Sequence, residues 1–179
     1  MKKTPTGTSV GVDDPYDHAS LCDHLTGEGT CRYAFEYPQH DPEFAEARRA
    51  DEFACPVVSD ETDEGWNWAD CPHFRATATD RECARCGLEE KRVAHDSDQR
   101  PLLEEHHLSY ADEGRETSHE ITVYLCRWCH AKVHTSWARV TDDASPDPEA
   151  LAELETRRGR EMDELGFETA RERTEGDRR

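Results

Sequence analysis

Two pairs of cysteines are the residues whose spacing most directly indicates chemistry. Cys83 and Cys86 form one pair and Cys126 and Cys129 the other, with two residues between the members of each. Four thiolates in two such turns complete the tetrahedral shell of a Zn²⁺ ion and leave no position for a substrate. The spacing therefore predicts a structural zinc site, whose binding free energy becomes folding free energy. Unliganded cysteines are the alternative, and the paired spacing argues against it.

Histidines lie between and beyond these pairs. His130 and His134 are four residues apart in a segment without helix breakers, so one face of a helix presents both. His106 and His107 are adjacent on a predicted strand end, where successive side chains point to opposite sides. We expect one of them to join His130 and His134 at a second metal ion. We expect the other to act as a base, because a neutral imidazole accepts a proton near pH 7. An ion in contact with a phosphodiester would stabilise the charge on the leaving oxygen.

The order of these residues resembles that of the HNH endonuclease family. The resemblance covers residues 83–137 and is carried by Cys83-x-x-Cys86, Glu105-His106-His107-Leu108-x-Tyr110, Gly114-Arg115-Glu116 and Leu125-Cys126-x-x-Cys129-His130-x3-His134. It implies an α+β fold with a small zinc-stapled ββα-metal core (HNH/treble-clef-like) and metal-dependent hydrolysis of phosphodiester bonds in DNA. By position it implies His107 as general base, and His106, His130 and His134 as ligands of a catalytic Mg²⁺, Mn²⁺ or Zn²⁺ ion.

The sequence departs from this family at one position. The family's middle residue, usually Asn, falls five positions before Cys126, where this chain has Ile121. The only asparagine of the chain is Asn67, which lies outside the motif. His119 or Glu120 could take the catalytic role if the strand is displaced by one or two residues. If neither does, the alternative is a non-catalytic zinc-binding module for nucleic acid or a protein partner.

Four further cysteines precede this segment, with 8, 23 and 15 intervening residues, and match no compact ligand pattern. Our first hypothesis for them is a second zinc site. An iron–sulfur cluster is the second hypothesis, because two of these cysteines are followed by proline. Buried unliganded thiols are the third, since free cysteine behaves as a small hydrophobe. These residues are Cys22, Cys31, Cys55 and Cys71.

The composition is strongly acidic. The 179 residues carry a net charge of −19, from 41 acidic and 22 basic side chains, and only four of the basic residues are lysines. This balance resembles that of proteins from salt-accumulating archaea, where salt screens the repulsion between carboxylates. Residues 81–140 are nearly neutral, with 9 basic and 11 acidic side chains, as expected of a surface that approaches phosphate or of a metal-site segment that simply has fewer acids. We therefore expect a halophilic protein whose partner is nucleic acid, most simply DNA.

Nothing in the sequence indicates a signal peptide or an apolar run of about 20 residues, so we expect a cytoplasmic protein without membrane segments. Cysteines in such a protein indicate metal thiolates rather than disulfides. We predict a flexible leader over 1–14, an N-terminal cysteine and histidine unit over 15–80, the HNH-like zinc domain over 81–140, and a linker with a C-terminal helix over 141–179.

Local patterns predict the elements of these units. Asp41 followed by Pro42 predicts the start of a helix that runs to about Asp51. Residues 103–108 and 122–125 are expected to be strands, and the segment after Cys129 a helix. A further helix is expected from Pro148 to about Arg173, docked on the core.

Overall fold

The computed structural model describes residues 1–58, 66–90, 103–109 and 119–164. The chain divides into two compact units, Met1–Asp143 and Ala144–Arg179. The first unit contains a three-stranded sheet and several helices, so it is a small α+β fold as expected. Residues 110–118, which include Tyr110 and Gly114-Arg115-Glu116 of the HNH-like motif, lie outside the described residues.

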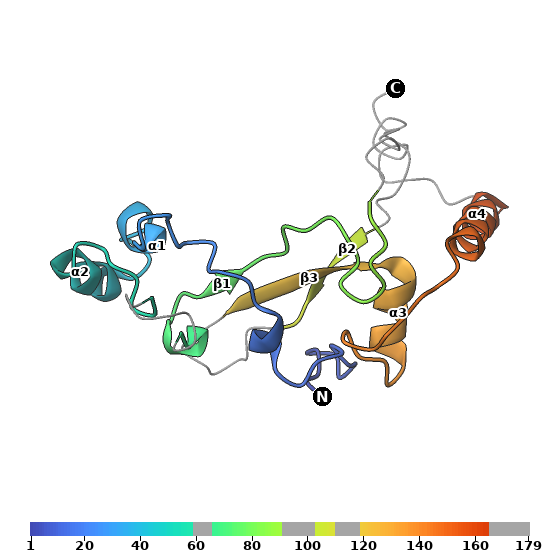
Figure 1. Cartoon of the computed structure of the whole chain (residues 1–179), viewed down its shortest axis with the longest axis horizontal. Coiled ribbons are helices and arrows are strands. Elements are labelled where there is room, and N and C mark those ends of the chain that lie inside the picture. Colours follow the sequence, from blue (N-terminus) through green and yellow to red (C-terminus); the bar gives the residue numbers. More distant parts are fainter. Residues whose placement is uncertain (59–65, 91–102, 110–118, 165–179) are drawn as a thin grey trace, which may run out of the picture. The chain divides into compact units, whose positions relative to one another are not determined.

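The sheet has the order β1-β3-β2, with β1 at Arg75–Ala76, β2 at Leu103–His107 and β3 at Glu120–Cys126 (Figure 1). β2 and β3 are antiparallel, and His106 faces Val123 across the ladder. β1 pairs in parallel with the start of β3. The β-branched and aromatic residues from Ile121 to Tyr124 favour the pleated backbone of β3. Both expected strands are confirmed.

The helix α3, Arg127–Thr135, begins directly after β3. Cys126 is its N-cap, and its Sγ accepts a hydrogen bond from the Cys129 N–H at 3.5 Å. The expected helix is confirmed and starts two residues before Cys129, because the cap lies inside the cysteine pair. Cys129 and Val133, one turn apart, are both fully buried and attach α3 to the core.

Residues 1–14 differ from the expected flexible leader. The Lys2 N–H donates to the Val12 carbonyl at 2.8 Å, and Val10 is fully buried in the core. Gly11 has φ +80°, and a Cβ at this position would lie 2.6 Å from Cγ1 of Val133 on α3. Burial of the apolar side chains of Val10 and Val12 is favourable in free energy. It fixes the position of a segment whose other residues are mostly polar.

The remaining N-terminal residues form two short helices and two single turns. They are the 3₁₀ turn η1 (Pro15–His18), α1 (Arg32–Glu36), α2 (Pro42–Ala50) and the 3₁₀ turn η3 (Trp68–Asp70). The expected helix after Asp41 is confirmed, and Asp41 Oδ1 accepts from the Phe44 N–H at 3.0 Å as its N-cap. The expected boundary between residues 80 and 81 is absent from the described chain, because β1 pairs with β3 and residues 1–143 form one unit.

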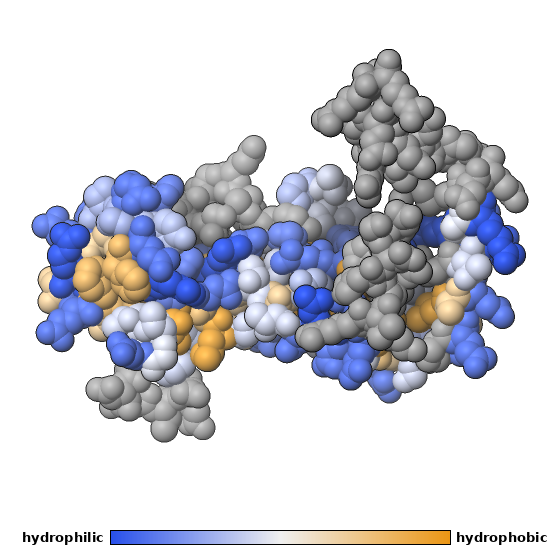
Figure 2. Space-filling view, turned by 90° about the horizontal axis from the view of Figure 1, so that it is seen from above, coloured by the Kyte–Doolittle hydropathy of each residue, from blue (hydrophilic) through white to orange (hydrophobic). Residues whose placement is uncertain are grey.

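The core lies between the sheet, α3 and the N-terminal segment. Its largest fully buried side chains include Phe74, Leu108, Ile121 and Leu125. Most of the surface seen in Figure 2 is hydrophilic, in keeping with a mean hydropathy of −1.02. Apolar atoms gather over the end of the unit that carries α1 and α2, where Phe35 is 45% exposed (Figure 2).

The second unit contains α4, Pro148–Glu164. An ion pair between Arg157 and Glu161 at 3.0 Å spans one turn of it. The expected extension to Arg173 lies outside the described residues, and docking of this helix on the core stays a prediction. None of the helices in the described ranges combines the length and the apolar character that crossing a membrane requires.

Candidate metal centres

The two cysteine pairs come together as predicted. The sulfur atoms of Cys83, Cys86, Cys126 and Cys129 all lie within 4.8 Å of one another, and those of Cys86 and Cys126 are 3.8 Å apart. Zn–S bonds of about 2.3 Å in a tetrahedron place sulfur atoms about 3.8 Å apart. The group therefore fits a zinc ion without rearrangement.

Backbone hydrogen bonds build the first pair into a tight turn. The Gly87 N–H donates to the Cys83 carbonyl at 2.8 Å, and Gly87 adopts φ +68°, which glycine tolerates without strain. The Ala84 N–H donates to the Tyr124 carbonyl at 2.8 Å and ties this turn to β3. The second pair spans the junction of β3 and α3, so the four sulfurs join three segments of the unit.

The protonation of these sulfurs also favours a cation. Hydrogen bonds from the Cys126 and Cys129 thiols lower the pKa of Cys83, so one thiolate is shared by its neighbours. The same contacts with Cys126 and Cys83 raise the pKa of Cys129. Four adjacent thiols, three of them buried, therefore cannot all ionise without a cation, and a bound Zn²⁺ would take the place of the shared protons. Arg85 adds a further positive charge, with Nη1 3.7 Å from the Cys129 sulfur.

The second group consists of His106 on β2 and His130 and His134 on α3. One nitrogen from each ring lies within 4.8 Å of the others. The rings meet edge to face, with centroids 4.7 to 5.0 Å apart. The structure thus confirms that the i, i+4 pair on the helix is met by one of the two adjacent histidines. That histidine is His106, which is 1% exposed.

The other nitrogen of each ring contacts an oxygen of the surrounding chain. His106 Nε2 donates to the Val10 carbonyl at 2.8 Å, and His130 Nδ1 donates to Glu104 Oε2 at 2.6 Å. A carbonyl and a carboxylate only accept, so these ring nitrogens carry the hydrogens and the opposite nitrogens of both rings bear lone pairs. Such contacts fix the ring orientation of metal-binding histidines and raise their basicity.

The third ring, His134, places Nδ1 3.3 Å from the Thr8 hydroxyl and Nε2 3.0 Å from His130 Nε2. Within the described residues, the buried His106 Nδ1 has no hydrogen-bond partner. A buried lone pair without a partner is costly, and a cation shared with His130 and His134 would satisfy it. The donor set therefore fits a divalent ion.

Burial favours the neutral form of two of these rings, His106 and His134. It lowers the pKa of His106 to about 4, and His130 and His134 add to the shift because their positive charge would oppose a second one. Burial also lowers the pKa of His134, with His130 acting in the same direction. The site is closed on the His106 side, whereas the His130 side chain is 25% exposed. Three histidine ligands beside solvent leave a coordination position for water or substrate, as in catalytic metal sites.

His107 lies on the opposite face of β2 from His106, as strand alternation predicts. Its side chain is 42% exposed, and its Nε2 lies 3.7 Å from Glu120 Oε1. The other oxygen of Glu120 forms an ion pair with Arg75 Nε at 2.7 Å. His107 is therefore separate from the three-histidine group and has a carboxylate beside it.

The structure does not bring His119 to the histidine group. Its ring is 6% exposed, and its Nδ1 lies 2.5 Å from the Tyr16 hydroxyl. The rings of Tyr16 and Phe74 contact it edge to face. Ile121, at the position of the family's middle residue, is fully buried and fills the core. Of the two substitutes considered from the sequence, only Glu120 lies beside His107.

The four N-terminal cysteines are free thiols, of which Cys31 and Cys71 are buried. In contrast to the central set, their sulfurs are not a group within 4.8 Å. Their arrangement is taken up below.

Sequence reasoning missed several contributors to these centres. Glu104 could have been found, because it shares the strand face of His106 two residues away. Arg85 lies inside the first cysteine pair, which is a weaker signal. Thr8 and Val10 carry no signal, because only the packing of the N-terminal segment brings them to the histidines.

Comparisons with known proteins complete this description. Neither the curated proteins nor the solved structures include a match to the chain. A family does match residues 1–173, and it is described as a family of unknown function, DUF7097. The chain therefore belongs to the DUF7097 family.

Proposed function

We propose that this protein is a divalent-metal-dependent nuclease that hydrolyses phosphodiester bonds in DNA through an HNH-like site. The observation that carries the proposal is a set of three histidine ring nitrogens that all lie within 4.8 Å of one another. His106 comes from β2 and His130 and His134 from α3, and solvent reaches the group on one side.

The order of elements supports the same proposal. Two antiparallel strands are followed by a helix, and the four-cysteine group lies at the strand-to-helix junction. This arrangement agrees with a zinc-stapled ββα core in which thiolates stabilise the fold and histidines hold the reactive ion. The two donor sets differ in chemistry, which suits a closed structural site and an open catalytic one.

The residues have separate tasks in this proposal. A divalent ion held by the three histidines would supply Lewis-acid stabilisation of the phosphate oxygens. Val10 and Glu104 hold two of the rings in orientation and keep their hydrogens away from the ligand position. His107 would accept the proton of the attacking water, and Glu120, 3.7 Å away, would orient its ring.

One observation favours a second candidate, a zinc-binding module without catalysis. Ile121 is fully buried where the HNH family usually has a polar residue. His107 also points away from the strand face that carries His106. A module of this kind would bind nucleic acid or a protein and hold its ions for stability alone.

Plasmid nicking separates the two candidates. Wild-type protein would be incubated with supercoiled DNA in high-salt buffer with Mg²⁺, Mn²⁺ or Zn²⁺, beside His107→Ala, His130→Ala and the control His40→Ala. His40 is exposed and distant in sequence from both donor sets, so this variant controls for contaminating nucleases and for the loss of an imidazole. We expect nicking by wild type and control, and a loss of about 100-fold or more in the other two.

Each variant must retain its thiolate-bound zinc and its thermal transition for the comparison to count. If folded wild-type protein nicks DNA with none of the three ions, the nuclease proposal is wrong and the binding module is favoured. Equal nicking by all four proteins would assign the activity to a contaminant and would also contradict the proposal.

A further inference from the structure

The four N-terminal cysteines lie at the borders of the N-terminal elements. Cys22 follows η1, Cys31 is the N-cap of α1, Cys55 follows α2, and Cys71 is the C-cap of η3, four positions before β1 begins. All four are free thiols. The widest spacing, from Cys31 to Cys55, contains both α1 and α2, and η3 lies between Cys55 and Cys71.

Backbone hydrogen bonds bring the first three of these borders together. Leu25 pairs with Cys31 in an isolated bridge, and the Leu25 N–H donates to the Cys22 carbonyl at 2.9 Å. The Cys31 N–H donates to the Phe53 carbonyl at 2.7 Å, and the Cys55 N–H donates to the Gly29 carbonyl at 2.9 Å. Residues around Cys22, Cys31 and Cys55 thus share one small network of strand-like contacts.

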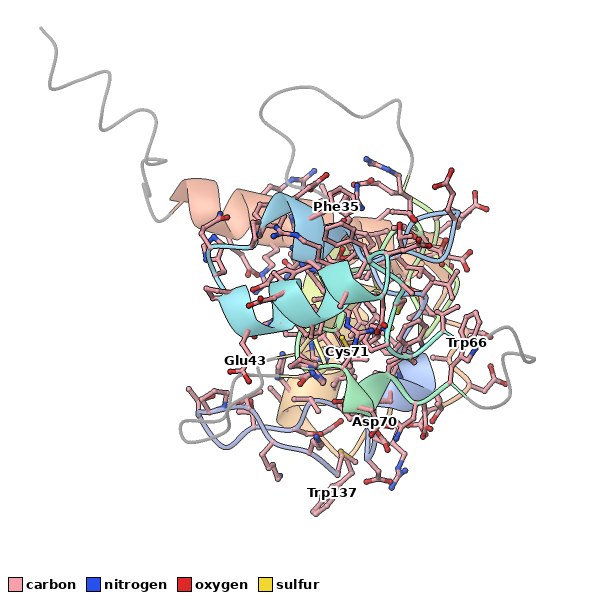
Figure 3. The ribbon with its side chains drawn as sticks, turned by 90° about the vertical axis from the view of Figure 1, so that its left-hand side faces the viewer. Phe35, Glu43, Trp66, Asp70, Cys71 and Trp137 are labelled. Carbon is pink, nitrogen blue, oxygen red and sulfur yellow. The ribbon has the colours of Figure 1, made fainter. Side chains whose placement is uncertain are left out.

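The fourth border joins this network through β1. The Asp23 N–H donates to the Arg75 carbonyl at 2.7 Å, and the Asp23 carboxylate accepts from the Thr77 hydroxyl at 2.7 Å. Cys71 itself is 5% exposed, and Figure 3 shows it inside the unit, whereas Phe35 and Trp137 lie at its margins. Backbone hydrogen bonds therefore join the segments that carry all four cysteines.

The thiols influence one another electrostatically in every pairwise combination. Burial is the largest cause that raises the pKa of Cys22, Cys31 and Cys71, the last to about 12. Each of these shifts is increased by the negative charge that neighbouring members of the set would carry, and Cys55 contributes to all three. These mutual effects agree with the backbone contacts that join the segments of the four cysteines.

Hydrogen bonds from peptide N–H groups to these sulfurs lower the pKa values that burial raises. Those of Ala34 and Tyr33 counter the rise in the pKa of Cys31, those of Arg75 and His24 do the same for Cys22, and that of His73 for Cys71. Apart from Arg75, each amide belongs to a residue two or three positions after the cysteine. The Cys129 N–H stands in the same relation to Cys126 in the central group. Both clusters thus present their sulfurs to backbone donors that favour thiolates.

The N-terminal elements also bury few apolar side chains that could stabilise them. Among the described residues from 20 to 58, the only buried apolar side chains are Cys31, Ala34 and Ala45. Phe35 and Tyr37 are 45% and 42% exposed. Segments with so small a core are usually stabilised by a metal or by disulfides.

We propose that Cys22, Cys31, Cys55 and Cys71 bind one Zn²⁺ ion, which joins α1 and α2 to the start of β1. The site is structural, because four thiolates leave no open position. It is independent of the proposed nuclease activity. Since the sulfurs are not all within 4.8 Å, and tetrahedral zinc needs about 3.8 Å between them, the side chains turn toward one another when the ion binds.

The test counts thiolate-bound zinc in the full chain. All proteins would carry His130→Ala and His134→Ala, so that the histidine group does not contribute. Metal content and zinc X-ray absorption would then be compared for this background, for added Cys71→Ser, for added Cys83→Ser and for both together. We expect two sulfur-coordinated zinc ions per chain in the background, one in each cysteine variant and none in the combination.

One zinc ion in the background that disappears with Cys83→Ser and persists with Cys71→Ser would overturn the proposal. Iron with acid-labile sulfide would also overturn it, in favour of an iron–sulfur cluster. If Cys71→Ser does not fold, thiol alkylation of the folded background protein decides. Protection of all four N-terminal cysteines that is lost when a chelator removes zinc supports the site, and free alkylation at full zinc occupancy overturns it.

Discussion

The four-cysteine group at the β3–α3 junction and the three-histidine group on α3 and β2 differ in how completely they enclose an ion. The cysteine group has four donors, joins three segments and has three members that are at most 3% exposed. The histidine group has three donors and is partly open to solvent at His130. One helix therefore contributes to both a closed and an open site. Closure favours stability, and an open position favours exchange of water or substrate.

Removal of a sulfur ligand should have the largest effect. We expect Cys129→Ser to lose the central zinc and to lower the melting temperature more than any other variant here, because structural zinc sites contribute apparent free energies of about 10–16 kcal/mol. Zinc content and thermal unfolding by circular dichroism would measure this. A variant that keeps the wild-type melting temperature without zinc would show that the cysteine group is not a structural staple.

Removal of a histidine ligand should separate binding from stability. We expect His130→Ala to lower the affinity for the second ion at least 100-fold and to leave the thiolate-bound zinc in place, since two ring ligands alone hold a divalent ion weakly. Calorimetric titration with Mn²⁺ or Zn²⁺ would measure the affinity, with His40→Ala as control. Loss of the fold instead would contradict the distinction between an open and a closed site.

Substitution of Glu104 tests whether the hydrogen bonds to the outer nitrogens of the histidine rings affect the affinity for the metal ion. Its carboxylate lies 2.6 Å from His130 Nδ1 and 3.3 Å from Arg127 Nε. We expect Glu104→Gln to weaken binding of the second ion by about 10- to 100-fold. Glu105→Gln is the matched control, because Glu105 lies on the other strand face and accepts from the Thr122 hydroxyl at 2.8 Å. Equal effects of the two variants would show that the loss comes from charge in general.

Among these variants, substitution of Tyr16 should have the smallest effect. We expect Tyr16→Phe to remove the contact with His119 and to lower the free energy of unfolding by about 1 kcal/mol, with unchanged metal content. Urea unfolding would measure the difference. If this variant instead lost binding of the second ion, His119 would belong to the reactive site after all.

Local patterns predicted the elements near the site because their signals are short-range. The β-branched run of β3, the N-cap at Asp41 and the breaker-free segment after Cys129 each act within a few residues. The 3₁₀ turn η1 has a signal of the same kind, because Asp14 before Pro15 accepts from the Tyr16 N–H as its N-cap. The two-residue strand β1 has none, and its conformation is set by pairing with β3.

The sequence by itself determined the donor sets. Only two residues separate the paired cysteines, and three separate His130 from His134. Those side chains therefore lie close together in a tight turn or on one face of a helix. Tertiary structure decided which of His106 and His107 joins the helix, because the face of β2 that packs against α3 depends on strand pairing. It also brought the Val10 carbonyl to His106 and gathered the N-terminal cysteines, since these contacts span tens of residues and depend on where apolar side chains leave water.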